Sequence, residues 1–284
     1  MRNSAITDKS FDIGTTLSYE LSVGFCDQYC SYVILDPSRM KFVAFRQIWF
    51  DEKVEARGQA DRFRDIIIGD RLLNQHYYST RFMYLTPLSV LVPSLHFVQD
   101  NPEAFFRFSA PLLPGEQVLY RKVPAVDAFT VFSMPESLYK LTGILLNDVE
   151  FFHQSCPLIA EAIKRPAGLH ADSRVLASVN PGFVDIIVIR EGQLLLFNSF
   201  RIRNTSDLAF FILYMYDQFG LSQEETPAEL TGHLDRYPGA LELLRDYIPK
   251  AGFSGLPKDF SYGHLFGDHF PSRHSPLINL TRCE

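Results

Sequence analysis

The chain has 284 residues, 46% hydrophobic and 21% charged, so it is long enough for two domains and apolar enough to bury a core rather than stay disordered. Its formal net charge of −6 argues against nucleic acid as a partner, because nucleic-acid-binding domains usually present a basic face. The longest apolar run, Leu208–Tyr216, is far shorter than the roughly 20 residues of a membrane span, so we expect no integral membrane segment.

The first half begins with three strand-like runs that follow a polar terminus, which we expect to be frayed. The runs are Leu17–Phe25, Tyr32–Leu35 and Lys41–Phe50, and the short breaks between them have turn chemistry. A helix is predicted next, from about Glu55 to Leu73, because its apolar residues recur with helical spacing. Three meandering strands followed by a helix therefore open the chain.

The middle of the chain alternates short strands with helices. Strands are predicted at 81–85, 89–92, 117–123, 128–132 and 149–153, and helices at 102–108, 136–146 and 157–164. The polar stretch Ala167–Ser173 is the best candidate for an interdomain linker.

The second half repeats the opening order of elements. Strands are predicted at Val175–Val179, Val184–Ile189 and Leu194–Phe200, followed by a helix that Asn204 can cap. A short strand at 229–231, a helix at 239–247 and a last apolar piece at 277–280 complete the chain. The repeated order predicts an α/β protein of two related domains, residues 1–166 and 167–284, the second including a C-terminal tail.

This order of elements resembles that of the actin-like ATPase superfamily, which includes sugar kinases, heat-shock-70 chaperones and FtsA. The matching pieces are Tyr19-Glu-Leu-Ser-Val, Leu91-Val-Pro, Gly143-Ile-Leu-Leu-Asn-Asp-Val-Glu-Phe-Phe, Leu196-Phe-Asn-Ser-Phe and Leu230-Thr-Gly. The chain is most similar to the FtsA and PilM branch and, within it, to an uncharacterised bacterial family with an actin-like ATPase fold. The resemblance implies two ribonuclease H-like domains, each a mixed five-stranded sheet flanked by helices, with a cleft between them.

The superfamily binds ATP in that cleft, so the resemblance also implies where the site residues should lie. Each first hairpin of the family carries Asp-x-Gly, but the first hairpin here reads Ser22-Val23-Gly24 and the second reads Asn180-Pro181-Gly182. Both glycines are present and both carboxylates are absent, while Asp185 follows the second hairpin closely. A proline in the loop also removes an N–H group that could hold a phosphate.

The turn that faces the adenosine in the family normally holds a pair of glycines. Here it reads Thr231-Gly232-His233, so a histidine side chain stands where the base would approach. We interpret Ser22, Gly24, Asn180, Gly182, Asp185, Thr231, Gly232 and His233 as the positions of a degenerate nucleotide cleft.

A second stretch, Asp12-Ile-Gly-Thr-Thr16, spells a good phosphate-binding motif. In the family that motif ends a buried strand, whereas mostly polar residues precede Asp12 here. We therefore predict that Asp12 belongs to the terminal segment and not to the cleft. If Asp12 did lie in the cleft, nucleotide binding would again be expected.

Two other groups of residues could suggest metal or redox chemistry. His264, His269 and His274 are spaced by five residues, which does not align ligands on a helix, so we interpret them as surface or packing residues. Cys26 and Cys30 flank the first hairpin turn, and we interpret them as reduced thiols. The sparse, irregular set of four cysteines fits a reducing cytoplasm, and no metal site is predicted.

These observations favour a non-catalytic, cytoplasmic pseudo-ATPase that acts as a scaffold or adaptor for another protein. No cofactor is expected for it. The alternative is an active ATPase or small-molecule kinase that uses Asp12 or Asp185 with ATP and magnesium in an altered interdomain site. A third hypothesis, an α/β enzyme of another kind, has no motif to support it, since neither a nucleophile-elbow nor a P-loop pattern occurs.

Overall fold

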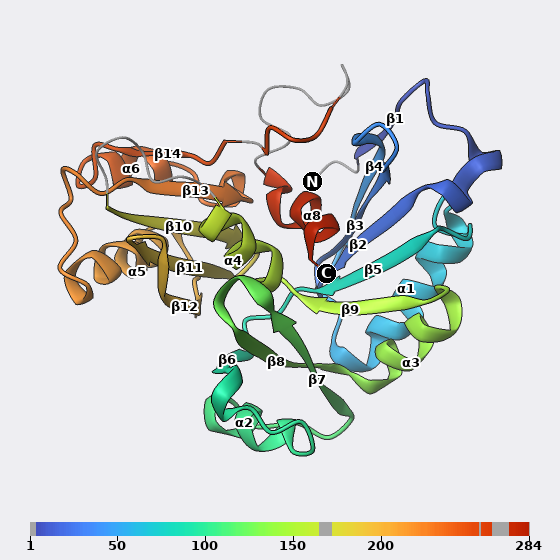
Figure 1. The fold of residues 1–284 in the computed structure, drawn as a ribbon, viewed down its shortest axis with the longest axis horizontal. Helices are drawn as coiled ribbons and strands as arrows, with labels where there is room; N and C mark the ends of the chain where they lie inside the picture. Colours follow the sequence, from blue (N-terminus) through green and yellow to red (C-terminus); the bar gives the residue numbers. More distant parts are fainter. Residues whose placement is uncertain (1–3, 165–171, 256, 263–272, 284) are drawn as a thin grey trace.

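The computed structural model describes residues 4–164, 172–255, 257–262 and 273–283. Two mixed sheets lie on either side of a central helical layer, and a smaller sheet lies below them in the view of Figure 1. The strand orders are β1-β4-β3-β2-β5-β9, β12-β11-β10-β13-β14 and β6-β8-β7. The α/β fold predicted from the sequence is confirmed, with two large sheets of mixed direction.

The first large sheet is built on an antiparallel meander. Its strands are β1 (Ser4–Thr7), β2 (Glu20–Phe25), β3 (Tyr29–Asp36), β4 (Lys41–Trp49), β5 (Ser79–Tyr84) and β9 (Val149–His153). Strand β5 pairs with β2 in parallel, and β9 pairs with β5 in parallel. Helices α1 (Ala56–Gly69) and α3 (Glu136–Leu145) flank this sheet on one side, beside each other.

This sheet has six strands rather than the five predicted, because part of the polar N-terminal segment is a strand. Ser4–Thr7 pairs antiparallel with the edge of β4, from Gln47 to Ala44. Residues 12–18, which precede β2, form the 3-10 helix η1 (Ile13–Ser18) and its cap. The prediction of a frayed terminus was therefore wrong for residues 4–7, where pairing with β4 overrides weak local strand propensity.

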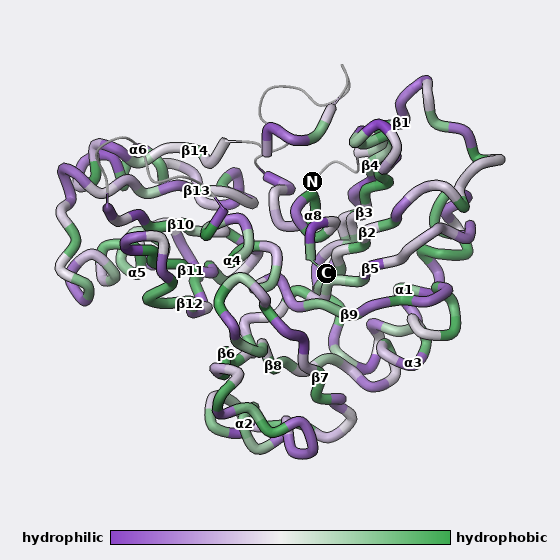
Figure 2. The backbone as a smooth tube through the Cα atoms, in the orientation of Figure 1, coloured by the Kyte–Doolittle hydropathy of each residue, from purple (hydrophilic) through white to green (hydrophobic). Residues whose placement is uncertain are grey.

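The second large sheet repeats this plan. It contains β10 (Ser173–Asn180), β11 (Phe183–Arg190), β12 (Gln193–Arg201), β13 (Ala228–Gly232) and β14 (Ala251–Phe253). The first three strands form an antiparallel meander, and β13 pairs with β10 in parallel, as β5 does with β2. Helices α5 (Thr205–Gln218) and α6 (Ala240–Arg245) pack on its outer side. Figure 2 shows the hydrophobic residues of α5 and of the strands beside it.

The small sheet consists of β6 (Ser89–Pro93), β7 (Glu116–Val123) and β8 (Ala128–Pro135), all antiparallel. Helix α2 (Pro102–Ser109) covers one side of it, and Phe106, Val118 and Val131 form its own small core. Besides η1, the described residues form the short 3-10 helices η2 (Ser94–His96), η3 (Pro124–Val126), η4 (Leu234–Arg236) and η5 (Leu280–Arg282).

The layer between the two large sheets is made by α4 (Ser155–Lys164) and α8 (Ser275–Asn279). Buried Glu161 of α4 accepts hydrogen bonds from Ser275 Oγ and, at 2.8 Å, from Asn279 Nδ2, which fixes α8 against α4. Helix α8 also packs against β2 and β3, so the end of the chain returns to the first sheet. One hydrophobic core runs through this layer from Phe45 to Ile187 and so joins both sheets.

Candidate functional site

The equivalent hairpins of the two large sheets face each other and are in direct contact. The turn after β2 contains Gln28, and the turn after β10 contains Pro181 and Gly182. Gln28 Nε2 donates a hydrogen bond to the Pro181 carbonyl at 3.2 Å, and its Oε1 accepts one from Arg236 Nη1 at 2.9 Å. A single half-buried glutamine therefore bridges the two turns between which a nucleotide would have to sit.

The backbone groups of the second turn already have partners within the chain. The Gly182 N–H donates to the Tyr237 hydroxyl at 3.0 Å, and this hydroxyl donates to the Asn180 carbonyl at 3.4 Å. Pro181 has no N–H to offer. The amide that would be aimed at a phosphate in a phosphate-binding loop is thus occupied by an internal tyrosine.

Asp185 is fully buried in β11 and has three neutral hydrogen-bond donors. Ser199 Oγ donates at 2.5 Å, Asn180 Nδ2 at 3.0 Å and Gln154 Nε2 at 3.3 Å. Burial is the largest influence on this carboxyl group and raises its pKa to about 7, against the opposing effect of the three donors. Both oxygens are held by protein groups, so the carboxylate does not face a space in which a metal or water could be oriented.

Aromatic rings fill the space between the hairpins. His233, which follows β13, packs edge-on against Tyr29 and Trp49, with ring centroids 5.1 and 5.0 Å away. His274 lies 6.0 Å from His233 and 4.5 Å from the ring of Phe45 on β4. Both histidines are buried, and burial is the main cause that lowers the pKa of His233 to about 3 and that of His274 well below its ordinary value. The two rings are therefore neutral packing groups at physiological pH.

The cavity that remains at this point has a volume of about 20 Å³, room for about one water molecule. Its walls include Asn180, Gly232 and His233, together with Ser31 and His274. The structure thus brings three of the predicted site positions together around a nearly filled space. Gly232 could not be another residue, because its φ is 86° and an added Cβ would lie 2.2 Å from the Val179 carbonyl oxygen.

The remaining predicted positions lie nearby, in packed strands. Ser22 and Gly24 are strand residues of β2 that precede the turn, and Ser22 does not line the cavity. A Cβ on Gly24 would be 3.5 Å from the Leu277 side chain of α8. Thr231 is buried in β13 opposite Ser178. Each of these positions is part of the packed core and not of an open groove.

The exposed Asp12 lies away from this cavity. Its carboxylate accepts a hydrogen bond from the Gly14 N–H at 2.8 Å and caps η1, so it has a local structural role. His264 and His269 lie outside the described residues. No group of three or more His, Cys, Asp and Glu side chains is placed to hold a metal ion within residues 4–164, 172–255, 257–262 and 273–283.

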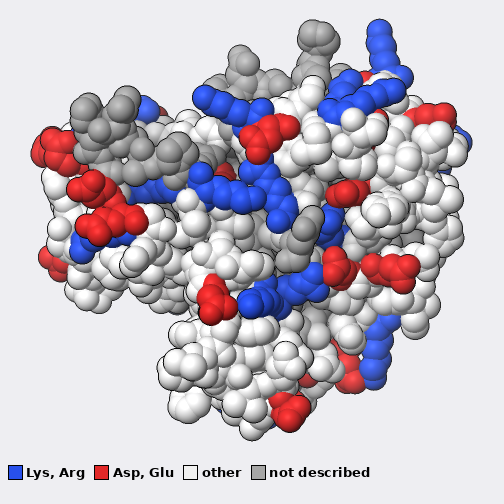
Figure 3. Space-filling model, viewed as in Figure 1, with Lys and Arg blue, Asp and Glu red and all other residues white. Residues whose placement is uncertain are grey.

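Sequence reasoning missed Gln28, Tyr237 and Arg236 as site residues. Gln28 and Tyr237 reach the second hairpin from distant parts of the chain, and Arg236 stacks over the Trp49 ring at 4.8 Å. None of them belongs to a motif, so nothing in the sequence distinguishes them from surface residues. In the view of Figure 3, Lys and Arg side chains gather in a band along the junction of the two halves.

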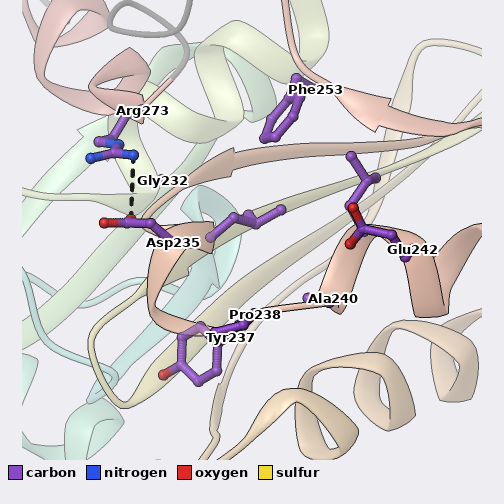
Figure 4. Close-up of a pocket in the computed structure, with 11 residues that line it drawn as sticks. Gly232, Asp235, Tyr237, Pro238, Ala240, Glu242, Phe253 and Arg273 are labelled. Atoms are coloured by element: carbon purple, nitrogen blue, oxygen red, sulfur yellow. Dashed lines mark ion pairs between the residues drawn. The ribbon is translucent and has the colours of Figure 1, made fainter.

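A larger cavity of about 360 Å³ lies beside Gly232, between the end of β13, the start of α6 and Phe253. Figure 4 shows Tyr237, Pro238 and Phe253 around it, with Arg273 and Asp235 paired at 3.5 Å across one side. Its walls are mostly apolar. Gly232 therefore lines two cavities, this larger one and the 20 Å³ cavity between the hairpins.

Two meandering sheets that face each other across paired hairpins define this chain as a protein of the actin-like ATPase fold. The family described as "Protein of unknown function (DUF3822)" matches residues 8–251, and the chain belongs to this family. No curated protein matches the chain.

Three solved structures are similar to it. A Bacteroides thetaiotaomicron protein with an actin-like ATPase fold and unknown function is 22% identical, with a TM-score of 0.80 over 96% of this chain and 99% of that one. A PilM–PilN type IV pilus biogenesis complex contains a chain 10% identical, with a TM-score of 0.59 and coverages of 93% and 97%. The ethanolamine utilization protein EutJ of Carboxydothermus hydrogenoformans is 10% identical, with a TM-score of 0.51 and coverages of 93% and 90%. These likenesses establish the fold.

No helix in the described part of the chain combines the length and apolarity needed to cross a membrane.

Proposed function

We propose that this chain is a non-catalytic member of the actin-like superfamily that acts as a scaffold or adaptor for another protein. The observation that carries the proposal is the bridge from Gln28 to Pro181, because it holds the two hairpins in contact where a nucleotide phosphate would lie. The occupied Gly182 amide and the buried, fully bonded Asp185 support it, since neither group is available to a phosphate or a metal.

The likeness to PilM gives further support to a role in an assembly. The similar PilM structure is of a PilM–PilN complex, so one protein of this fold occurs together with another protein. We propose a role of the same general kind here, without carrying over the identity of the partner.

An ATP titration tests the non-catalytic part of the proposal. The full chain is titrated with a fluorescent ATP analogue with and without magnesium, and an active actin-like ATPase serves as the positive control. We expect no saturable binding at micromolar ligand and no gain of thermal stability, whereas a ligand at 100 times its Kd would add about 2.7 kcal/mol. Micromolar binding with turnover would refute the proposal.

The scaffold part is tested by crosslinking in the cells that produce the protein, followed by reconstitution of each captured pair from purified components. We expect one protein to bind the purified chain directly and in the absence of nucleotide. Failure of every captured protein to bind the purified chain would count against an adaptor role.

The alternative, an ATP-binding enzyme with an altered site, is favoured by one observation. The 360 Å³ cavity adjoins Gly232, at the turn that faces the adenosine in the superfamily. If this alternative holds, ATP binds and Phe253→Asp, which places a charge at the half-exposed lining residue, weakens binding at least tenfold. Tyr247→Asp, at an exposed aromatic position that does not line the cavity, is the matched control.

We also propose the two-domain division at 1–166 and 167–284.

We further propose a cytoplasmic location. All four cysteines are free and buried, which suits a reducing compartment. Burial raises the pKa of the Cys26 thiol to about 12, so it is unreactive when folded. Protein taken from its native cells and denatured in a thiol-labelling reagent is expected to carry four labels, and fewer would contradict the assignment.

A further inference from the structure

The open edges of the three sheets differ sharply in length and chemistry. Most of them are short: β1 has 4 residues, β9 and β6 have 5 each, and β14 has 3. Strand β7 has 8 residues but carries the charges of Arg121 and Lys122. Short strands and charged residues are the usual protection against edge-to-edge pairing.

Strand β12 is the exception. It has 9 residues, pairs only with β11 among the described strands, and holds no proline and no charge before its last residue, Arg201. A register shift places a bulge at Leu195, so its regular part runs from Leu196 to Arg201. A long, apolar, open edge of this kind is a template for an added strand.

The backbone groups along this regular part can be assigned to the two sides of the strand. The Ile202 N–H donates to the Gly182 carbonyl of the turn before β11 at 3.0 Å. Because an antiparallel ladder alternates, the N–H and C=O groups of Phe197, Ser199 and Arg201 point away from β11. The Ser199 N–H is bonded to the Asn198 side chain at 2.9 Å, which agrees with an N–H that has no strand partner.

A row of aromatic side chains continues from this edge onto α5. Phe200 of β12 stacks on Phe211, with ring centroids 4.6 Å apart, and Phe211 contacts Phe210. Phe210 stacks on Tyr214 in turn, and these two side chains are 60% and 41% exposed. Apolar surface of this kind beside an open edge would be covered by whatever pairs with β12.

The charges at the two ends of β12 are complementary to each other. Glu191 lies just before the strand, whereas Arg201 and Arg203 lie at and beyond its end, and all three are exposed. Within the described residues, no ion pair joins any of them to another side chain. An antiparallel pair of two such strands places the acidic end of each beside the basic end of the other.

We propose that β12 is a dimerisation edge that pairs antiparallel with β12 of a second copy of this chain. The two copies are related by a two-fold axis at Asn198, so that Phe197 of each copy lies opposite Ser199 of the other and their outward N–H and C=O groups form the ladder. It joins the two second sheets into one continuous sheet, in which Glu191 of each copy faces Arg201 and Arg203 of the other. The aromatic residues of α5 flank the joint on one side.

Light scattering on the full-length chain at about 1 to 100 μM tests the dimer, with a concentration-dependent shift toward twice the chain mass expected. Glu191→Lys and the double variant Arg201→Glu/Arg203→Glu each put like charges at both ends of the joint. Each variant alone is expected to dimerise about tenfold more weakly or worse. Mixed together, they are expected to form a heterodimer of near wild-type affinity, because both ion-pair sites then hold opposite charges.

Leu195→Lys, which adds a charge at the edge, is expected to weaken the dimer, whereas Ile144→Lys, at a 79% exposed position on α3, is the matched control. Far-UV circular dichroism and thermal melting confirm that each variant is folded. A monomeric wild type over the whole range overturns the proposal. So does a dimer that survives both charge reversals, or a mixture of the two variants that stays monomeric.

Discussion

The Gln154 side chain donates a hydrogen bond to Asp185 across the junction between the two large sheets, with Nε2 and Oδ1 3.3 Å apart. Gln154 follows β9 and is itself held by the backbone of Thr86, whose carbonyl accepts from Nε2 at 2.7 Å and whose N–H donates to Oε1 at 3.2 Å. Asp185 belongs to the second sheet. An amide fixed in the first half therefore solvates a buried carboxyl group of the second.

Replacement of Asp185 by Asn is expected to flatten the pH dependence of stability between pH 4 and 7. Burial raises the pKa of Asp185 from 3.8 to about 7, so over that range the unfolded chain loses this proton while the folded chain keeps it. The contribution of Asp185 to the free energy of unfolding is therefore fully present below pH 4. It is lost as the pH rises toward 7, by as much as about 4 kcal/mol. Urea unfolding from pH 4.5 to 7.5 measures it, and an unchanged slope in the variant would contradict the assignment.

Replacement of His233 by Phe is expected to reduce the loss of stability in acid. Burial, with smaller effects of Arg273 and Arg236, lowers the pKa of His233 from 6.5 to about 3. As the pH falls below 6.5, the unfolded chain binds this proton and the folded chain does not, so stability falls. A phenyl ring keeps the contacts with Tyr29 and Trp49.

The control for this change is His76→Phe, because the His76 side chain is exposed in the folded chain. Thermal unfolding from pH 7 to 4 should show a shallower decline for His233→Phe than for the wild type or the control. Equal declines in all three proteins would mean that His233 is solvated in the folded chain.

Gly232→Ala is expected to destabilise the protein by roughly 3 kcal/mol or more. The new Cβ would lie 2.2 Å from a backbone oxygen that cannot move without breaking β10, and the φ of 86° is unfavourable for alanine. Gly239→Ala is the matched control, since its φ is 76° but nothing lies within 4 Å of the added atom. It should cost only about 1 to 2 kcal/mol. Urea midpoints that are equal for the two variants would show that the close contact is relieved.

Gln28→Ala is expected to cost about 1 to 3 kcal/mol, because it removes two hydrogen bonds and leaves Arg236 Nη1 without its amide partner. Hydrogen exchange should also rise at the turn of residues 180–182. Gln75→Ala removes a surface bond to the Arg71 carbonyl at 3.1 Å and should change neither quantity. An unaltered exchange rate in Gln28→Ala would show that the hairpins stay in contact without the bridge.

The order of helices and strands could be predicted because each element is marked by its own residues, through apolar periodicity, caps or turns. Asn204 caps α5, as predicted, by accepting a hydrogen bond from the Asp207 N–H at 2.9 Å. The meander of β10 to β12 follows from three apolar runs separated by turn residues. Caps and turns of this kind depend on neighbouring residues alone, so they can be predicted without knowledge of the rest of the chain.

The filling of the cleft could not be predicted, because it depends on contacts between distant residues. His233 meets Tyr29 and Trp49 of the first sheet, and no spacing in the sequence relates these three positions. The resemblance located Gly182 as a loop glycine, but only the fold shows that the Tyr237 hydroxyl occupies its amide. Strand β1 was missed for the same reason, since four residues within a mostly polar segment become a strand only beside β4.

The return of α8 to the first sheet has a consequence for how the protein is made. Glu161 is held by Ser275, 114 residues further along, and Leu277 covers the strand that contains Gly24. A nascent chain that has not yet reached residue 275 therefore leaves apolar side chains of β2 and β3 uncovered, although both strands were synthesised much earlier. The face of the first sheet that packs on α8 therefore closes only after the second sheet has been synthesised, and contacts between such distant residues favour slow folding and aggregation during synthesis.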